Sequence, residues 1–124
     1  MKIYKTKWFD RWADKQGLKD ESLCIAVDEM MAGLYEADMG AGLFKKRIAR
    51  AGQGKSGGFR TLVATKKEDR WIFVFGFPKS ERDNIDKDEA QALKALATHL
   101  LSLSESGIEN AKNRGELIGV NCHA

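Results

Sequence analysis

The hydrophobic pattern of the first third of the chain predicts a short strand and two helices. Residues 2–5 suit the strand, and a helix over about 8–15 ends near Gly17. Beyond it, apolar side chains recur at spacings of three and four positions, which places them on one helical face. They are Leu23, Val27, Met30, Met31 and Leu34. We predict a second helix over about 20–31, with Gly33 as its stop.

Three later stretches, 43–50, 59–66 and 70–77, are rich in β-branched and aromatic residues and predict strands. Their short connections favour an antiparallel meander. A helix then begins near Asp86, with Glu89 placed to complete a capping box.

The last part of the chain continues the same pattern. A shorter amphipathic segment stops at Gly115, and "LIGV" forms an extended end. The order of elements predicts an α+β domain in which helices pack against one face of a small antiparallel sheet.

The first of these strands carries a cluster of basic residues. Side chains alternate between the two faces of a strand, so Lys46 shares a face with Phe44 and Ile48, whereas Lys45 and Arg47 lie on the other face. We expect Phe44 and Ile48 to face the core and the other face to be a basic surface. An antiparallel neighbour would bring in Arg60, since it begins the next strand.

Charge is concentrated around this strand. The 124 residues have a net charge of +3, but residues 44–60 hold six basic residues and no acidic one, and the other 107 hold 15 basic and 18 acidic. An anionic partner responds to local potential, which makes this stretch the first functional signal. The length fits a single domain over residues 1–124.

Two cysteines, Cys24 and Cys122, allow at most one disulfide, whereas oxidised small proteins usually carry several. We therefore expect both to be free thiols. No apolar run has the length of a signal peptide core or a membrane span, so we expect a cytoplasmic protein that does not associate with membranes.

Several kinds of site are disfavoured by spacing. Gly54-Lys55-Ser56 ends like a nucleotide-binding P-loop, but Ala49 stands where the first glycine is required and a strand pattern follows. His99 and His123 make no recognisable zinc ligand set, and no Gly-x-Ser-x-Gly elbow is present. We expect neither a metal nor a cofactor.

Clustered Lys and Arg side chains can neutralise phosphates and stabilise a pentavalent phosphorane without a metal. The alternatives are a solvated basic face or a patch that docks a partner. Composition does not separate these possibilities.

A family resemblance favours the phosphate site. The stretches "GLFKKRIARAGQGKSGGFRTLVA" and "WIFVFGFPKSERDNI", followed by a leucine-rich helix, resemble toxins of type II toxin-antitoxin modules in the RelE/ParE superfamily, and most of all the HigB-like group. The resemblance covers about residues 36–105 and extends to the "ELIGV" ending.

The resemblance implies a compact RelE-like fold, similar to microbial RNases, in which a small antiparallel sheet packs against N-terminal helices and a C-terminal helix. It implies a ribosome-dependent mRNA endoribonuclease that enters the A site of the 30S subunit near rRNA. A cognate antitoxin, expected to be a small helix-turn-helix DNA-binding protein, would silence it. The 2'-hydroxyl would attack the adjacent phosphate with basic side chains in place of the usual His/Glu pair.

Site residues are carried over position by position. Lys45 and Arg47 match the two basic positions of the central strand, Arg60 matches the arginine after the turn that binds the scissile phosphate, and Lys79 matches the basic residue after the last strand. Other cations are candidates for contacts with RNA. They are Lys46, Arg50, Lys55 and Arg82.

The chain also departs from the RelE pattern. Ser80 stands where an arginine is expected and Asp86 lies near the place of a tyrosine, so the general base is open between a deprotonated Lys45 and the carboxylate of Glu81. Glu81 can equally pair with Arg82. Two other functions remain, a ParE-like inhibitor of DNA gyrase and a non-toxic module that binds RNA or protein.

Overall fold

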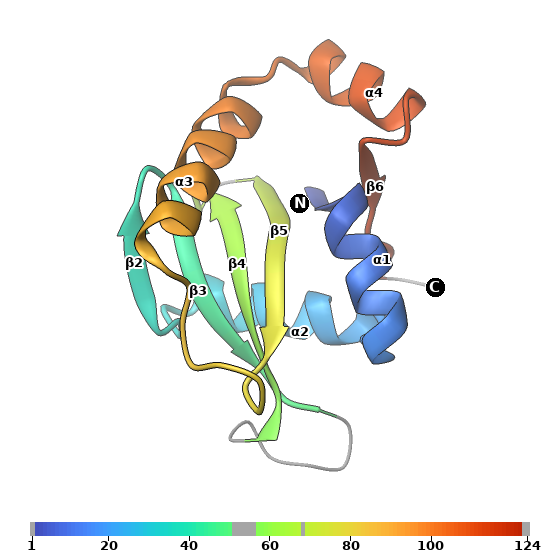
Figure 1. Ribbon diagram of the computed structural model, residues 1–124. Helices are drawn as coiled ribbons and strands as arrows, with labels where there is room; N and C mark the ends of the chain where they lie inside the picture. The colour runs from blue at the N-terminus through green and yellow to red at the C-terminus, as the bar shows by residue number, and fades with distance from the viewer. Residues whose placement is uncertain (1, 51–56, 68, 123–124) are drawn as a thin grey trace.

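The computed structural model describes residues 2–50, 57–67 and 69–122. These residues form four helices and six strands in the order β1-α1-α2-β2-β3-β4-β5-α3-α4-β6, which is an α+β arrangement (Figure 1). The strands are β1 (Lys2–Thr6), β2 (Ala37–Gly40), β3 (Leu43–Ile48), β4 (Phe59–Thr65), β5 (Arg70–Pro78) and β6 (Leu117–Gly119). The helices are α1 (Lys7–Gln16), α2 (Asp20–Met31), α3 (Lys87–Ser102) and α4 (Glu105–Asn113). The predicted α+β class is confirmed.

All six strands form one sheet in the order β2-β3-β4-β5-β1-β6. The meander of β3, β4 and β5 is antiparallel, as the short connections predict. The sheet as a whole is mixed, because β1 runs parallel to β5 and then pairs antiparallel with β6. Strand β2 is absent from the sequence prediction, and it forms a hairpin with β3.

The N-terminal helices begin and end at the signals in the sequence. The hydroxyl of Thr6 caps α1 by accepting from the N–H of Phe9, and Gly17 ends the helix with φ 71°, a left-handed conformation that glycine adopts readily. The apolar side of each helix is buried on one face of the sheet together with Trp71 and Phe73 of β5.

Helices α3 and α4 cover the opposite face. A capping box starts α3, since Asp86 accepts from the N–H of Glu89 while the Glu89 side chain accepts from the N–H of Asp86. Leu100 and Leu101 of α3 pack with Leu62 of β4 in the second core cluster. The expectation of helices on one face is wrong, because α3 crosses one side of the strands and α2 lies behind the other (Figure 1).

A β-bulge in β5 changes which side chains reach each face. Val63 pairs with Phe73 and Leu62 with Phe75, which leaves Val74 as an extra residue. Phe73 therefore packs under α1 and α2, whereas Val74 and Phe75 both pack on the α3 side. Trp71, Phe73 and Phe75 alternate in the sequence and would share one face of a regular strand, but the bulge puts Phe75 on the opposite face.

We expect Gly76→Ala to lower the free energy of unfolding by about 1–3 kcal/mol, as overpacking does. A Cβ atom at Gly76 would lie 2.5 and 2.7 Å from two ring carbons of Trp12, so the helix α1 or the strand must move. Gly119→Ala is the matched control, because a Cβ there meets no atom within 4 Å. Urea denaturation measures both variants, and equal midpoints would contradict this account of the α1 contact.

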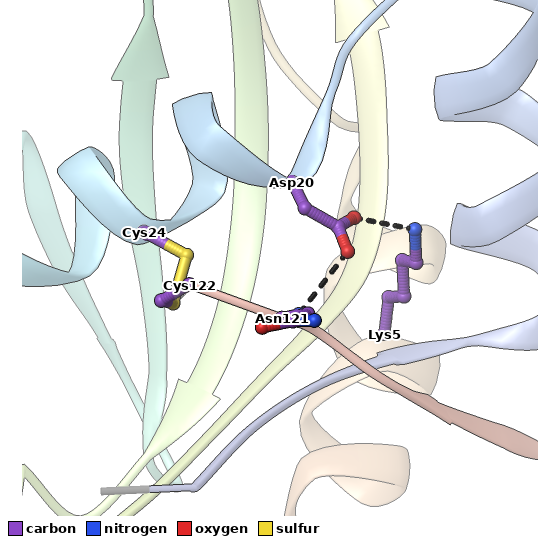
Figure 2. The surroundings of a disulfide bond; sticks show 5 residues. All are labelled: Lys5, Asp20, Cys24, Asn121 and Cys122. Atoms are coloured by element: carbon purple, nitrogen blue, oxygen red, sulfur yellow. Dashed lines mark hydrogen bonds and ion pairs between the residues drawn. A yellow bond between two sulfur atoms is a disulfide. The ribbon is translucent and has the colours of Figure 1, made fainter. Parts of the chain in front are cut away.

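A disulfide joins the two cysteines. Cys24 in α2 bonds to Cys122 across 98 residues of sequence, with the Cα atoms 5.8 Å apart. Beside the bond, Asp20 accepts from Nζ of Lys5 at 2.8 Å and from the backbone N–H of Asn121 at 3.2 Å (Figure 2). The prediction of free thiols is wrong, because it used cysteine number and compartment and had no information on spatial distance.

None of the helices in the described ranges is long and apolar enough to cross a membrane.

Candidate functional site

Strand β3 presents basic residues on both faces of the sheet. Lys45 and Arg47 lie on the α3 side, in alternation with buried Phe44 and Ile48 on the other side. Lys46 shares the buried side, where it is 3% exposed and its Nζ lies 2.8 Å from Oε1 of Glu29. This ammonium is not accessible to RNA. The prediction that Lys46 contacts RNA is therefore wrong.

Arg47 and Arg60 are direct partners across β3 and β4. Like charges directly opposite each other on neighbouring strands destabilise a sheet, so such a pair needs a compensating anion. Glu36 provides it, with Oε2 2.7 Å from Nε of Arg47 and 2.5 Å from Nη1 of Arg60. The predicted placement of Arg60 beside Arg47 is confirmed.

Both arginines keep unused donors at this site. The Nε atoms of Arg47 and Arg60 are buried and donate to no acceptor among the described residues; the contact of Arg47 with Glu36 is an ion pair without hydrogen-bond geometry. A buried donor without an acceptor is costly. The side chain of Arg60 is 10% exposed and that of Arg47 is 42% exposed, so an incoming anion meets Arg47 first.

Glu36 is the candidate site residue that the sequence prediction lacks. Its N–H donates to the carbonyl of Lys45, which aligns it with the start of the β2–β3 hairpin. The glycines of "DMGAGL" are the signal for that hairpin, because Gly40 and Gly42 have φ of 88° and 80°. Because the prediction has no β2, it places no carboxylate between Arg47 and Arg60, and the structure corrects this.

Lys45 is held by the loop that joins β5 to α3. Its Nζ donates to Oδ1 of Asn84 at 3.1 Å, and the same oxygen accepts from the N–H of Ile85 at 3.0 Å. The "ERDNI" segment, predicted to lead into the helix, therefore also positions a cation of β3.

Arg82 lies in the same loop and forms a bidentate salt bridge with α3. Its Nη1 and Nη2 donate to the two carboxylate oxygens of Glu89 at 2.9 and 2.8 Å. The guanidinium lies 5.6 Å above the ring centre of Phe75 and 4.9 Å above that of Phe77. Arg82 therefore pairs with Glu89 and not with Glu81, the partner that the sequence suggested. The Arg82–Glu89 pair lies over the two aromatic rings.

Comparison of the chain with protein-family models identifies its family. Residues 1–120 match the model of the RelE toxin of the RelE / RelB toxin-antitoxin system. The chain belongs to the RelE toxin family. No curated protein matches the chain. The match does not distinguish the HigB-like group, which stays a prediction.

Membership in the RelE family makes the chain the toxin component of a toxin-antitoxin system and implies a cognate antitoxin as partner. The match extends well beyond the 36–105 stretch of the sequence resemblance and includes both N-terminal helices.

The remaining predicted RelE site residues lie at the ends of the meander. The N–H of Lys79 donates to the carbonyl of Gly58 at 3.0 Å, which holds this lysine just beyond the β4–β5 pairing. Glu81 is exposed in the following turn. Arg50 lies 4.6 Å above the ring of Phe59, and Lys55 lies outside the described residues.

The Arg82–Glu89 pair should make the stability of this RelE-family toxin depend on pH. Hydrogen bonds from Arg82, and next the backbone N–H of Asp86, lower the pKa of Glu89 from 4.5 to about 2. Because the folded state has the lower pKa, this stabilisation is present above pH about 4.5 and is lost as the pH falls toward about 2. We expect Arg82→Leu to raise the pKa of Glu89 toward its ordinary value, as measured by NMR titration of the carboxyl carbon.

Part of the pKa shift should survive in Arg82→Leu, because Asp86 still donates to Glu89. Arg114→Leu is the matched control, since Arg114 pairs with Glu116 on the surface and should change only the pKa of Glu116. An unchanged pKa of Glu89 in Arg82→Leu would contradict the pairing.

Proposed function

We propose that this chain is the endoribonuclease of its toxin-antitoxin module and that it cleaves mRNA in the ribosomal A site. The observation that carries the proposal is the cross-strand pair of Arg47 and Arg60, in which two guanidinium groups share the carboxylate of Glu36. A phosphodiester offers oxygen atoms to which the guanidinium groups of this pair can donate. RelE-family membership supports the same chemistry.

In the proposed reaction the 2'-hydroxyl attacks the adjacent phosphorus. The P–O5' bond breaks, leaving a 2',3'-cyclic phosphate and a 5'-hydroxyl that takes up a proton. Arg60 and Arg47 donate to the non-bridging oxygens, where negative charge increases in the transition state. Lys45, oriented by Asn84, and Lys79 add positive charge on either side.

The contacts of Arg47 and Arg60 support Glu36 as a third candidate for the group that accepts the proton of the 2'-hydroxyl. Lys45 and Glu81 remain alternatives, but Glu36 is the carboxylate that contacts both arginines within the described residues. If Arg47 and Arg60 hold the scissile phosphate, the 2'-hydroxyl next to it would lie close to this carboxylate. We therefore assign proton removal from the 2'-hydroxyl to Glu36.

Glu36→Gln tests this assignment, because the amide keeps the shape of the side chain and removes its basicity. We expect cleavage by purified toxin on programmed ribosomes to fall by about 100-fold while RNA binding persists. Glu81→Gln is the control and should retain activity. Cleavage that rises in Glu36→Gln would instead identify Glu36 as an internal competitor of the phosphate.

Expression from a tightly controlled promoter, followed by mapping of mRNA 5' ends, tests the function itself. We expect codon-phased cuts that vanish in Lys45→Ala, Arg47→Ala and Arg60→Ala and persist in Lys66→Ala, a surface variant outside the cluster. Growth arrest with intact mRNA and damaged DNA would overturn the proposal in favour of gyrase inhibition. Normal growth with intact RNA would overturn both.

The finer predictions follow from this function. We propose that the chain is HigB-like, that its antitoxin is a small helix-turn-helix protein, and that it acts in the cytoplasm, where translating ribosomes are found. A neighbouring gene for such an antitoxin would support the module.

A further inference from the structure

The outward side of α1 has a composition that the proposed cleavage site does not explain. Lys7, Arg11 and Lys15 follow one another at intervals of four residues, with Trp8 and Trp12 beside them at the same interval. At about 100° per residue, the three cations cover an arc of about 80° and the two indoles lie next to it. The buried side of the helix, at Phe9 and Ala13, faces away from this stripe.

The three cations of the α1 stripe are available to a ligand. Within the described residues, none of Lys7, Arg11 and Lys15 forms an ion pair or a side-chain hydrogen bond. The acidic Asp10 of the same helix is instead paired with Lys5, at 3.0 Å. Lys7, Trp8, Arg11, Trp12 and Lys15 together line a shallow hollow of about 450 Å³.

The indole of Trp8 is exposed and held in place. It is 46% exposed, although its ring stacks on Phe75 with 4.6 Å between ring centres and on Trp12 with 6.1 Å. A fixed aromatic face beside unpaired cations is the combination with which proteins bind single-stranded nucleic acid, because bases stack on the ring and phosphates pair with the cations.

The α1 stripe is continuous with the candidate site. Phe75, which supports Trp8, lies 6.3 Å from Phe77 between ring centres, and Arg82 lies over both rings. Phe77 is in turn the register partner of Arg60. Aromatic rings and guanidinium groups therefore form an unbroken line from α1 to the arginine pair.

We propose that the outer side of α1 binds the single-stranded mRNA that flanks the cleaved phosphate. Lys7, Arg11 and Lys15 contact consecutive phosphates, and one base stacks on Trp8. This inference rests on the proposed function for the identity of the RNA. A neighbouring groove of about 550 Å³, lined by leucines of α3 and by Trp8, is mainly apolar and so differs in chemistry from the α1 stripe.

The test measures binding separately from cleavage. Purified wild-type chain is titrated with a fluorescein-labelled single-stranded 12-nucleotide RNA that carries 2'-O-methyl groups and cannot be cut. The variants are Trp8→Leu, which keeps an apolar contact with Phe75, and the triple variant Lys7→Gln/Arg11→Gln/Lys15→Gln. The matched control is Lys66→Gln/Lys87→Gln/Lys112→Gln, which removes the same charge from other surfaces.

We expect the α1 triple variant to bind about 10-fold more weakly at moderate salt and to lower the slope of log affinity against log salt by about 2. Trp8→Leu should weaken binding about 5- to 10-fold and abolish tryptophan quenching by RNA. The control triple variant should lose less than about 2-fold in affinity for the RNA, since its three lysines do not line one surface.

Outcomes separate this inference from the proposed function. If the α1 variants bind the RNA like the control while cellular mRNA is still cut, the inference is overturned and the function stands. If the α1 variants lose RNA binding but wild type makes no cuts, the nuclease proposal fails and the RNA surface stands. If short RNA binding is unchanged and only affinity for empty 30S subunits or for an acidic antitoxin peptide falls, the surface serves rRNA or protein and the inference is overturned.

Discussion

Arg60→Gln is expected to lower the rate of mRNA cleavage on programmed ribosomes by about 100- to 1000-fold, the loss typical for one donor to transition-state charge. Arg60 lies at the centre of the site, with β3 on one side and β5 on the other, opposite Arg47 and Phe77. Its guanidinium is the least exposed of the cations proposed to contact the phosphate, so water can replace it poorly.

Arg60→Lys separates geometry from charge. Lysine keeps the positive charge but lacks the planar fork that can contact Glu36 and a phosphate oxygen together, so we expect most of the activity to be lost here too. Thermal unfolding serves as the folding control for both variants. Full activity of Arg60→Gln with an intact fold would exclude Arg60 from the reaction.

Loss of the Cys24–Cys122 bond is expected to lower the free energy of unfolding by about 2–4 kcal/mol. The bond closes a segment of 98 residues, and long closed segments restrict the unfolded chain most. It also ties the end of the chain, just after β6, to α2 (Figure 2). Urea denaturation of wild type with and without reductant, and of Cys24→Ser/Cys122→Ser, measures the effect.

The serine variant should match reduced wild type and should not respond to reductant. Equal stability of the oxidised and reduced chains would contradict the expected contribution. In cytoplasm that keeps thiols reduced, the working protein would be the less stable form, with Asn121 still held by Asp20.

Local signals explain why much of the fold is predictable from sequence. The capping residues Asp86 and Glu89 set the start of α3, and Gly17 sets the end of α1. The two-residue period of β3 places Lys45 and Arg47 on one face without knowledge of any other element. Antiparallel pairing then brings Arg60, at the start of β4, opposite Arg47 near the end of β3.

Features that depend on distant segments are not predictable in this way. Glu36 joins the arginines through β2, a strand of four residues with a weak hydrophobic pattern. The burial of Lys46 needs Glu29 from α2, and the disulfide needs β6 to pass beside α2. Each is a contact between elements, for which periodicity along one element carries no information.

The extra residue at Val74 lies where strand β5 passes from one task to another. Before it, β5 supplies Trp71 and Phe73 to the core under α1 and α2; after it, Phe75 and Phe77 turn toward the arginine cluster while Gly76 makes room for Trp12. Deleting Val74 would restore regular alternation, with Phe73 still in the core and Phe75 and Phe77 still on the side of the arginine pair. Deleting Gly76, in contrast, would turn Phe77 toward Trp12 and away from Arg82, so the residue that must be kept for the support of Arg82 is the glycine and not the extra residue of the bulge.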